Sequence, residues 1–220
     1  TRIEFPEVTH PINAPLGSDL VLLRKDGSEE TLLSGGEGAI ADPYPSFDGK
    51  WIYYSKFHDQ RTEAKDRQRP GNPSRAGADI YKLNVETREN IRLTFQEWTP
   101  NTGLLDWSGN HLSKDDSGDY CLGYGIFNLG PCPLPNGRII FTSSRNSFLP
   151  NQDFTAPNLQ LFVMDDDGKN VELIGHMNLG SALHPTVLTD GRVMFSSYEA
   201  QGLRDRRIWG LWAIRPDGTQ

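Results

Sequence analysis

Three segments of the chain repeat one pattern around a glycine. They read PYPSFDGKWIYYS from Pro43, PCPLPNGRIIFTS from Pro131 and PTVLTDGRVMFSS from Pro185. In each, a proline lies six residues before the glycine, Asp or Asn precedes the glycine, and an apolar run after it ends in Ser. Asp-Gly or Asn-Gly between two extended runs is a strong hairpin signal, because a type I′ turn needs positive φ at both central residues. Each segment therefore predicts two antiparallel strands.

A second pattern follows the first and occurs four times. Its copies read DLVLLRKDGSEETLLS, ADIYKLNVETRENIRLT, LQLFVMDDDGKNVELI and GLWAIRPDGTQ. Aligned from Val21, Tyr81, Phe162 and Trp212, they place a turn at the same offset. The apolar residues before that turn alternate or run continuously, as in strands of stacked sheets. A hairpin followed by a hairpin gives a four-stranded antiparallel sheet, and serial repetition of that unit is typical of a β-propeller.

The predicted fold class is therefore all-β, a partial β-propeller of four-stranded antiparallel blades, with about three and a half blades in this chain. We expect one incomplete domain over residues 1–220, made of a half blade at 18–34, a blade at 42–97, an inserted loop at 98–130, a blade at 131–175 and an incomplete blade at 183–220. The first and last sheets would then expose apolar faces and unpaired strand edges, which soluble proteins cover. We expect other protein subunits, or the remainder of the same polypeptide, to cover them.

The long connections fall on one face of the predicted propeller. In this fold the hairpin turns emerge on one face, and the loops between second and third strands or between blades emerge on the other. Segments 56–77, 97–130, 145–157 and 198–207 all belong to the second group. Loops longer than about 12–15 residues in a compact domain are usually functional or disordered. This long-loop face is therefore the predicted binding surface.

The candidate binding residues on that face are aromatic, His and Arg side chains, and aromatic residues and Arg are enriched at binding hot spots. They are His58, Arg61, Trp98, Trp107, His111, Tyr120, Tyr124, Phe148, Tyr198 and Arg204. The alternative is that these rings only hold the long loops against the propeller.

Motifs for catalysis are absent from the sequence. It has no GxSxG elbow, and Ser55, Ser143 and Ser197 recur at one position of the repeat, as structural residues do. We therefore predict no catalytic residue in this chain on its own. None of the five histidines has a partner at metal-ligand spacing. The expectation is no cofactor and no metal, with calcium at Lys114–Asp119 as the alternative, although the downstream Glu of a calcium loop is missing.

The two cysteines, Cys121 and Cys132, lie in the segment CLGYGIFNLGPC. A disulfide between them would close a short loop and stabilise the fold by about 3 kcal/mol. Two free thiols are the alternative, and the sequence leaves both open.

The net charge and the hydropathy of the chain limit the classes of partner that it is expected to bind. The formal net charge of -7 and the pI near 5.2 argue against nucleic acid, whose binding needs clustered Lys and Arg. No apolar run approaches the roughly 18 residues that span a membrane.

The repeats also carry a resemblance to known propellers. PSFDGKWIYYS followed by ADIYKLNVETRENIRLT resembles the TolB-type, WD-repeat-like propellers of bacterial extracytoplasmic proteins. From residue 131 onward, LPNGRIIFTSSRN and HPTVLTDGRVMFSSYE are similar to the propeller of hydrazine synthase alpha-subunit-like proteins. In that group a separate domain binds c-type haem, and this sequence has no CxxCH motif.

The resemblance implies a rigid platform that docks other domains or subunits, at a periplasmic or otherwise extracytoplasmic location. The leading prediction is a non-catalytic propeller scaffold that binds through its long-loop face. One alternative is the propeller part of a haem enzyme subunit resembling hydrazine synthase alpha. Another is a carbohydrate- or peptide-binding propeller that uses Trp98, Trp107 and Tyr124.

Overall fold

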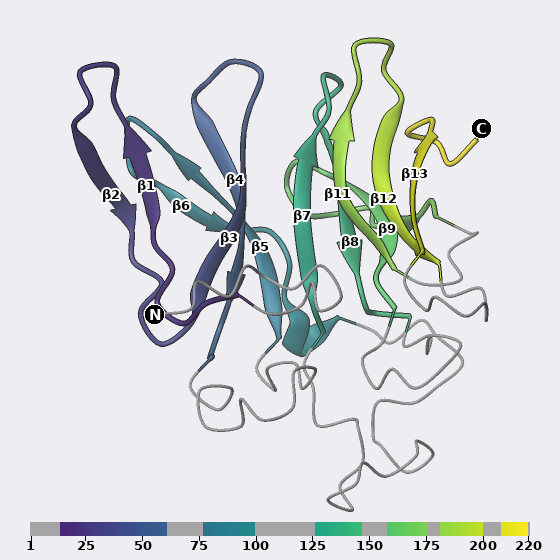
Figure 1. The fold of residues 1–220 in the computed structure, drawn as a ribbon, viewed down its shortest axis with the longest axis horizontal. Coiled ribbons are helices and arrows are strands. Elements are labelled where there is room, and N and C mark those ends of the chain that lie inside the picture. The colour runs from purple at the N-terminus through teal and green to yellow at the C-terminus, as the bar shows by residue number, and fades with distance from the viewer. Residues whose placement is uncertain are drawn as a thin grey trace, which may run out of the picture.

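The strands form four antiparallel sheets that follow one another along the chain (Figure 1). The computed structural model describes residues 14–60, 77–99, 126–146, 158–175, 181–199 and 208–219. The first sheet contains β1 (Leu20–Leu23) and β2 (Glu29–Leu33). The second contains β3 (Ala39–Pro45), β4 (Trp51–Phe57), β5 (Ala78–Asn84) and β6 (Asn90–Arg92). The 3-10 helix η1 (Gln96–Trp98) comes after β6.

The third and fourth sheets have the same order of antiparallel strands as the second. The third contains β7 (Asn128–Pro133), β8 (Arg138–Ser143), β9 (Gln160–Asp165) and β10 (Glu172–Leu173). The fourth contains β11 (Ala182–Val187), β12 (Val193–Glu199) and β13 (Ile208–Ile214). In every sheet, strands adjacent in the chain are paired neighbours. The all-β class and the partial propeller of four-stranded blades are thus confirmed.

The first strands of the second and third sheets begin earlier in the chain than the repeat predicted. Strand β3 starts at Ala39 and β7 at Asn128, so residues 128–130 belong to a strand and not to the inserted loop expected at 98–130. The physical reason is a bulge. The register of β3 with β4 shifts between Ala41 and Tyr44, and pairing resumes on its far side. The sequence pattern revealed only the part of the strand after the bulge.

The bulge explains the recurring proline. Asp42, Gly130 and His184 each precede that proline and have φ of 51°, 60° and 51°. Proline has no N–H and interrupts the ladder, and a residue with positive φ bends the strand at that point. The three bulges lie at equivalent places, because each register shift spans the recurring proline and the residue before it. His184 is largely exposed there, with its Nδ1 3.9 Å from Asp42 Oδ1.

The hydrophobic core lies between successive sheets. Ile139 on β8 packs in the cluster shared with the second sheet, and Ile140 beside it packs in the cluster shared with the fourth. Successive residues of a strand point to opposite faces, so a sheet buried on both faces needs a continuous apolar run. The run IIF in β8 therefore follows from its place between two other sheets.

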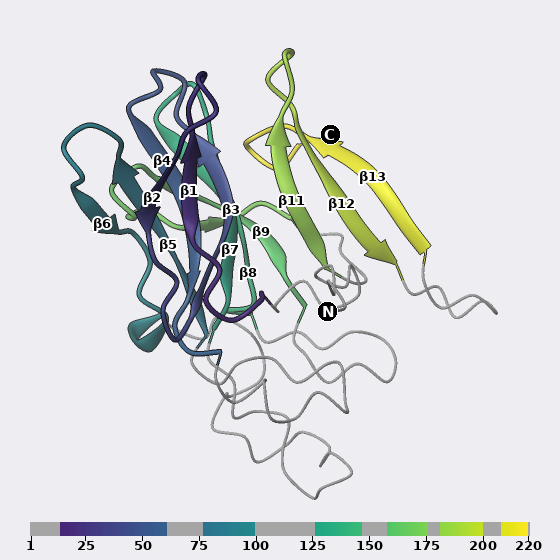
Figure 2. The ribbon, with the colours of Figure 1, turned by 60° about the vertical axis from the view of Figure 1, so that its left-hand side comes forward.

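The two outer sheets expose apolar side chains, as predicted. Leu23 on β1 is 67% exposed and Leu211 on β13 is 74% exposed. In Figure 1 the sheet of β1 lies at one end of the row of sheets and the sheet of β13 at the other, and in Figure 2 the sheet of β11, β12 and β13 stands apart on the right. Burial of one such side chain contributes about 1.5–3 kcal/mol, which neither face gains within the described part of this chain.

Candidate functional site

The chain enters and leaves its long connections at one end of the sheets. The ends of β4, β8 and β12 and the starts of β5, β9 and β13 all lie at the lower end in Figure 1, and the hairpin turns lie at the upper end. We call these the loop end and the hairpin end. Three connections, those spanning residues 61–76, 147–157 and 200–207, therefore start and finish at the loop end.

The structure describes part of the predicted binding surface. His58 and Trp98 lie at the loop end, and the backbone of Tyr198 lies there in β12. The other candidates fall outside the described residues: Arg61, Trp107, His111, Tyr120, Tyr124, Phe148 and Arg204. Their part in binding stays a prediction.

A fully buried carboxylate organises the described part of the loop end. Asp79, at the start of β5, is 0% exposed. Its Oδ2 accepts hydrogen bonds from His58 Nε2 at 2.8 Å and Arg92 Nη2 at 2.6 Å. Its Oδ1 accepts one from Thr94 Oγ1 at 2.6 Å. Burial alone would raise the pKa of Asp79, but the hydrogen bonds from His58, Thr94 and Arg92 outweigh burial and hold that pKa below its ordinary value.

Two further donors to Asp79 come from the connection after β6 and from the next sheet. The backbone N–H of Gln96 in η1 donates to Oδ1 at 3.1 Å, and Asn128 Nδ2 on β7 donates to the same oxygen at 3.1 Å. One carboxylate thus joins β5, η1 and β7, and so fixes how the second sheet meets the third at the loop end.

His58 is held in a defined orientation by this carboxylate. Its Nε2 must donate, because an ionised carboxylate only accepts. Its side chain is 23% exposed, and its ring meets the ring of Tyr81 edge-on with centroids 6.4 Å apart. Nδ1 has no partner among the described residues and, in the neutral ring, is an acceptor. His58 can therefore accept a hydrogen bond from a bound group.

Next to His58 and Asp79 stands an exposed aromatic pair, Phe95 and Trp98. Their rings stack with centroids 5.5 Å apart and an interplanar angle of 19°. The Arg92 guanidinium lies 4.8 Å from the centre of the Phe95 ring. Trp98 is 78% exposed, the most exposed large apolar side chain among the described residues. We call this pair the Phe95-Trp98 platform.

A buried arginine also lies at the loop end. Arg145 follows β8, and its Nη2 donates to Asn128 Oδ1 at 2.9 Å while its Nε donates to Ser143 Oγ at 3.0 Å. Its guanidinium lies 5.2 Å from the Phe141 ring centre and 4.9 Å from that of Phe162. Burial lowers the pKa of Arg145 to about 10, although the negative charge of Asp79 acts to raise that pKa. The side chain is buried and, through Asn128 and Ser143, holds the segment after β8 against β7 within the third sheet.

Sequence reasoning missed Asp79 and Arg145. Arg145 did carry a signal, because aligning Gly49 with Gly137 places it at the position of the buried Phe57. A charged residue at an apolar position of a repeat indicates a buried polar contact. The contacts of Asp79 could not be read from the sequence, because its partners come from three separate stretches of the chain.

Two of the repeated serines, Ser55 and Ser143, make hydrogen bonds in the interior of the fold. Ser55 Oγ donates to Asp42 Oδ2 at 3.1 Å and accepts from the N–H of Gly130 at 3.0 Å. Ser143 Oγ donates to Asn128 Oδ1 at 2.8 Å. Both are fully buried at the bulge or beside it, where they satisfy backbone and side-chain groups of the inner strands.

Within the described residues, no group of three or more His, Cys, Asp or Glu side chains could hold a metal ion. The alternative calcium segment at Lys114–Asp119 lies outside those residues, so that interpretation stays untested. Cys132 is buried and has no disulfide partner among the described residues, and burial raises the pKa of its thiol to about 11. Cys121 also lies outside the described residues, and the disulfide stays a prediction. In the described part of the chain, no helix is both long and apolar enough to cross a membrane.

Known proteins match the chain by structure. Neither a protein-family model nor a curated protein sequence matches it. The structure of putative TolB from Agrobacterium tumefaciens superposes with a TM-score of 0.58 at 20% identity, over 93% of this chain and 55% of that chain. TolB from Acinetobacter baumannii gives 0.51 at 15% identity, over 89% and 34%. The chain has a TolB-like propeller fold.

Hydrazine synthase of Kuenenia stuttgartiensis shares this TolB-like fold. It superposes with a TM-score of 0.58 at 19% identity, over 96% of this chain and 28% of that chain. The chain thus spans about half the length of the first TolB structure, or 55%, and less of the others. At these identities the likeness establishes the fold and no residue's role.

Proposed function

We propose that the chain is a non-catalytic propeller scaffold that binds other protein subunits, or the remainder of its own polypeptide, through its loop end. The observation that carries this proposal is the Phe95-Trp98 platform, an exposed stacked aromatic pair at the end where the connections start and finish. Aromatic side chains are enriched at binding hot spots because a rigid ring buries a large area at little entropic cost.

The hydrogen bonds that hold the Phe95-Trp98 platform in place support a docking role. The Asp79 carboxylate ties His58, Arg92 and the start of η1 together, so the exposed rings stand on a rigid base. A preorganised surface loses little conformational entropy on binding. The described loop end offers aromatic rings, a guanidinium and an imidazole acceptor, which together suit a protein surface.

Two further observations support membership in a larger assembly. The outer faces of the first and last sheets expose Leu23 and Leu211, which suit burial against further sheets or a partner. The resemblance of the repeats to TolB-type propellers supports a periplasmic or otherwise extracytoplasmic location.

Substitution of Trp98 tests the proposal. In the full-length protein, Trp98→Ala should weaken the complex with its stoichiometric partner by about thirtyfold, the loss expected for a hot-spot residue. The matched control is Phe47→Ala, which removes another exposed aromatic ring, 64% exposed, from a hairpin-end turn. Titration calorimetry on the purified components measures both. Equal affinity for the Trp98→Ala variant and the parent would contradict the proposal.

Carbohydrate binding is the second candidate, because a flat, exposed indole stacked on another ring also suits the apolar face of a sugar. Binding of the intact protein on a glycan array, abolished by Trp98→Ala and kept by Phe47→Ala, would favour this function. A stoichiometric protein partner with no glycan bound would favour the scaffold.

A further inference from the structure

The two hairpin turns of each whole sheet are tied together by a backbone hydrogen bond. In the second sheet the N–H of Val85 donates to the carbonyl of Lys50 at 2.8 Å. In the third sheet the N–H of Asp166 donates to the carbonyl of Gly137 at 3.1 Å. Both acceptors directly precede the second strand of their sheet. We call this bond the turn clasp.

The fourth sheet cannot form the turn clasp. Alignment of Tyr81, Phe162 and Trp212 places Pro216 where the other sheets have Val85 and Asp166. Proline has no N–H to donate. Val193 pairs with Ile214, so the same register places Gly191 opposite Pro216. The carbonyl of Gly191 is therefore the equivalent acceptor, and it has no partner among the described residues.

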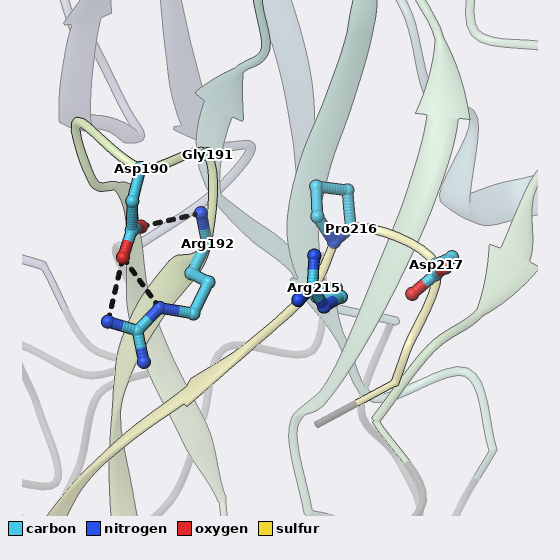
Figure 3. A pocket seen from close by; sticks show the side chains of 6 residues that line it. All are labelled: Asp190, Gly191, Arg192, Arg215, Pro216 and Asp217. Carbon is cyan, nitrogen blue, oxygen red and sulfur yellow. Dashed lines mark hydrogen bonds and ion pairs between the residues drawn. The ribbon is translucent and has the colours of Figure 1, made fainter.

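A pocket of about 250 Å³ lies where the clasp is missing. Figure 3 shows the turn after β11 on one side and the residues after β13 on the other, with space between them. The lining residues are Asp190, Gly191, Arg192, Arg215, Pro216 and Asp217. The pocket belongs to the hairpin end, so it is separate from the loop-end surface proposed above.

The carboxylates of the pocket are already engaged. Asp190 Oδ2 accepts from Arg192 Nε at 2.8 Å and pairs with Arg192 Nη2 at 2.7 Å (Figure 3). Asp217 Oδ1 accepts from the N–H of Thr219 at 3.0 Å and from its hydroxyl at 2.7 Å. The Arg215 guanidinium makes no hydrogen bond or ion pair with the described residues, although its charge lowers the pKa of nearby Asp217 after the hydrogen bonds from Thr219.

We propose that this pocket binds an acidic peptide segment of a partner protein. A backbone N–H of that segment takes the place of the missing clasp donor on the Gly191 carbonyl, and a carboxylate side chain pairs with Arg215. A carbonyl and a guanidinium that both lack a partner among the described residues stand on opposite sides of one pocket, and they match the alternating N–H and acidic side chain of an extended peptide. Charge-assisted pairing of Arg with a carboxylate is among the stronger hydrogen bonds in proteins.

The first test uses two blocked tripeptides, acetyl-Ala-Glu-Ala-amide and acetyl-Ala-Gln-Ala-amide, with the whole chain labelled with nitrogen-15. The Glu peptide should shift the amide signals of Gly191, Arg192 and Arg215 to saturation. The Gln peptide should bind about tenfold more weakly, because it lacks the charge. Equal binding of the two peptides would overturn the proposal. Binding of free glutarate as tight as that of the Glu peptide would also overturn it, because the site would then recognise a carboxylate alone.

Three variants separate the two contacts. Arg215→Gln should weaken binding of the Glu peptide about tenfold. Pro216→Val restores an N–H at the clasp position and leaves every charge in place, so it should close the pocket and also weaken binding. Arg24→Gln is the matched control, because Arg24 occupies the position of Arg215 in the first sheet, and it should leave binding unchanged. Unaltered binding by Pro216→Val would show that the missing clasp does not make the site.

Discussion

Asp79 shows how one residue can fix the geometry of a loop end. Fully buried, it accepts hydrogen bonds from His58, Arg92 and Thr94 and from the connection after β6. Such a carboxylate costs free energy to desolvate, and it stays ionised only because its partners all donate. Asp79 is therefore essential to the arrangement of the platform although no ligand could reach it.

The folded-state pKa of Asp79 lies below its ordinary value, and this predicts a pH dependence. A group with a depressed folded pKa adds stability above its unfolded pKa, near 4, and loses it as pH falls through the folded pKa. Asp79→Asn should therefore destabilise the protein by about 3–5 kcal/mol at pH 7, with a smaller deficit at pH 3. Urea unfolding at the two pH values measures this. A deficit of equal size at both would contradict the charged role, and Asp48→Asn, in an exposed turn, is the control.

At the scale of the element, the turn between β9 and β10 contacts the neighbouring sheet. A Cβ added to Gly168 would lie 2.2 Å from the Leu93 carbonyl oxygen, a backbone atom that cannot swing aside. The turn therefore requires glycine at this position for two reasons, its φ of 83° and this close approach to Leu93. An equivalent contact brings Gly218 to Ile174, so the hairpin turns themselves help to align successive sheets.

Gly168→Ala should destabilise the protein by about 3 kcal/mol or more, because strain and overpacking add. Gly27→Ala is the matched control, since Gly27 has the same φ of 83° and an added Cβ would meet nothing within 4 Å. Strain alone should cost the control about 1–2 kcal/mol. Chemical denaturation of both variants gives the difference, and equal losses would mean that the contact with Leu93 adds nothing.

The hairpins could be read from the sequence, because all except the one between β5 and β6 have local turn chemistry at an Asp-Gly or Asn-Gly pair. The bulges could not, because a register shift depends on pairing across two strands. The Phe95-Trp98 platform was found only in part. Trp98 was predicted by residue type, but its stacking on Phe95 depends on the η1 turn, which no periodic pattern marks. The aligned repeats show that Pro216 stands where the other sheets have a residue with an N–H. That this removes the turn clasp follows only from the hydrogen bonds of the other sheets.

At the scale of the whole molecule, the described residues form a row of four sheets, and the inner and outer sheets differ in what they bury. The third sheet packs against neighbours on both faces, whereas the first and fourth each have one covered face. Stacked blades gain most of their stability from interfaces with their neighbours. The two outer sheets should therefore be the least stable parts of the chain when nothing covers them.

The exposed outer faces should make the isolated 220-residue chain self-associate, because Leu23 and Leu211 lie beside unpaired strand edges. The double variant Leu23→Glu with Leu211→Glu should shift the chain toward monomer, since a charge on an edge strand opposes pairing between chains. Sedimentation velocity over a concentration series measures the change. Phe47→Glu, at an exposed turn, is the control and should sediment like the parent chain. A parent chain that remains monomeric at every concentration would contradict the view that these faces need a cover.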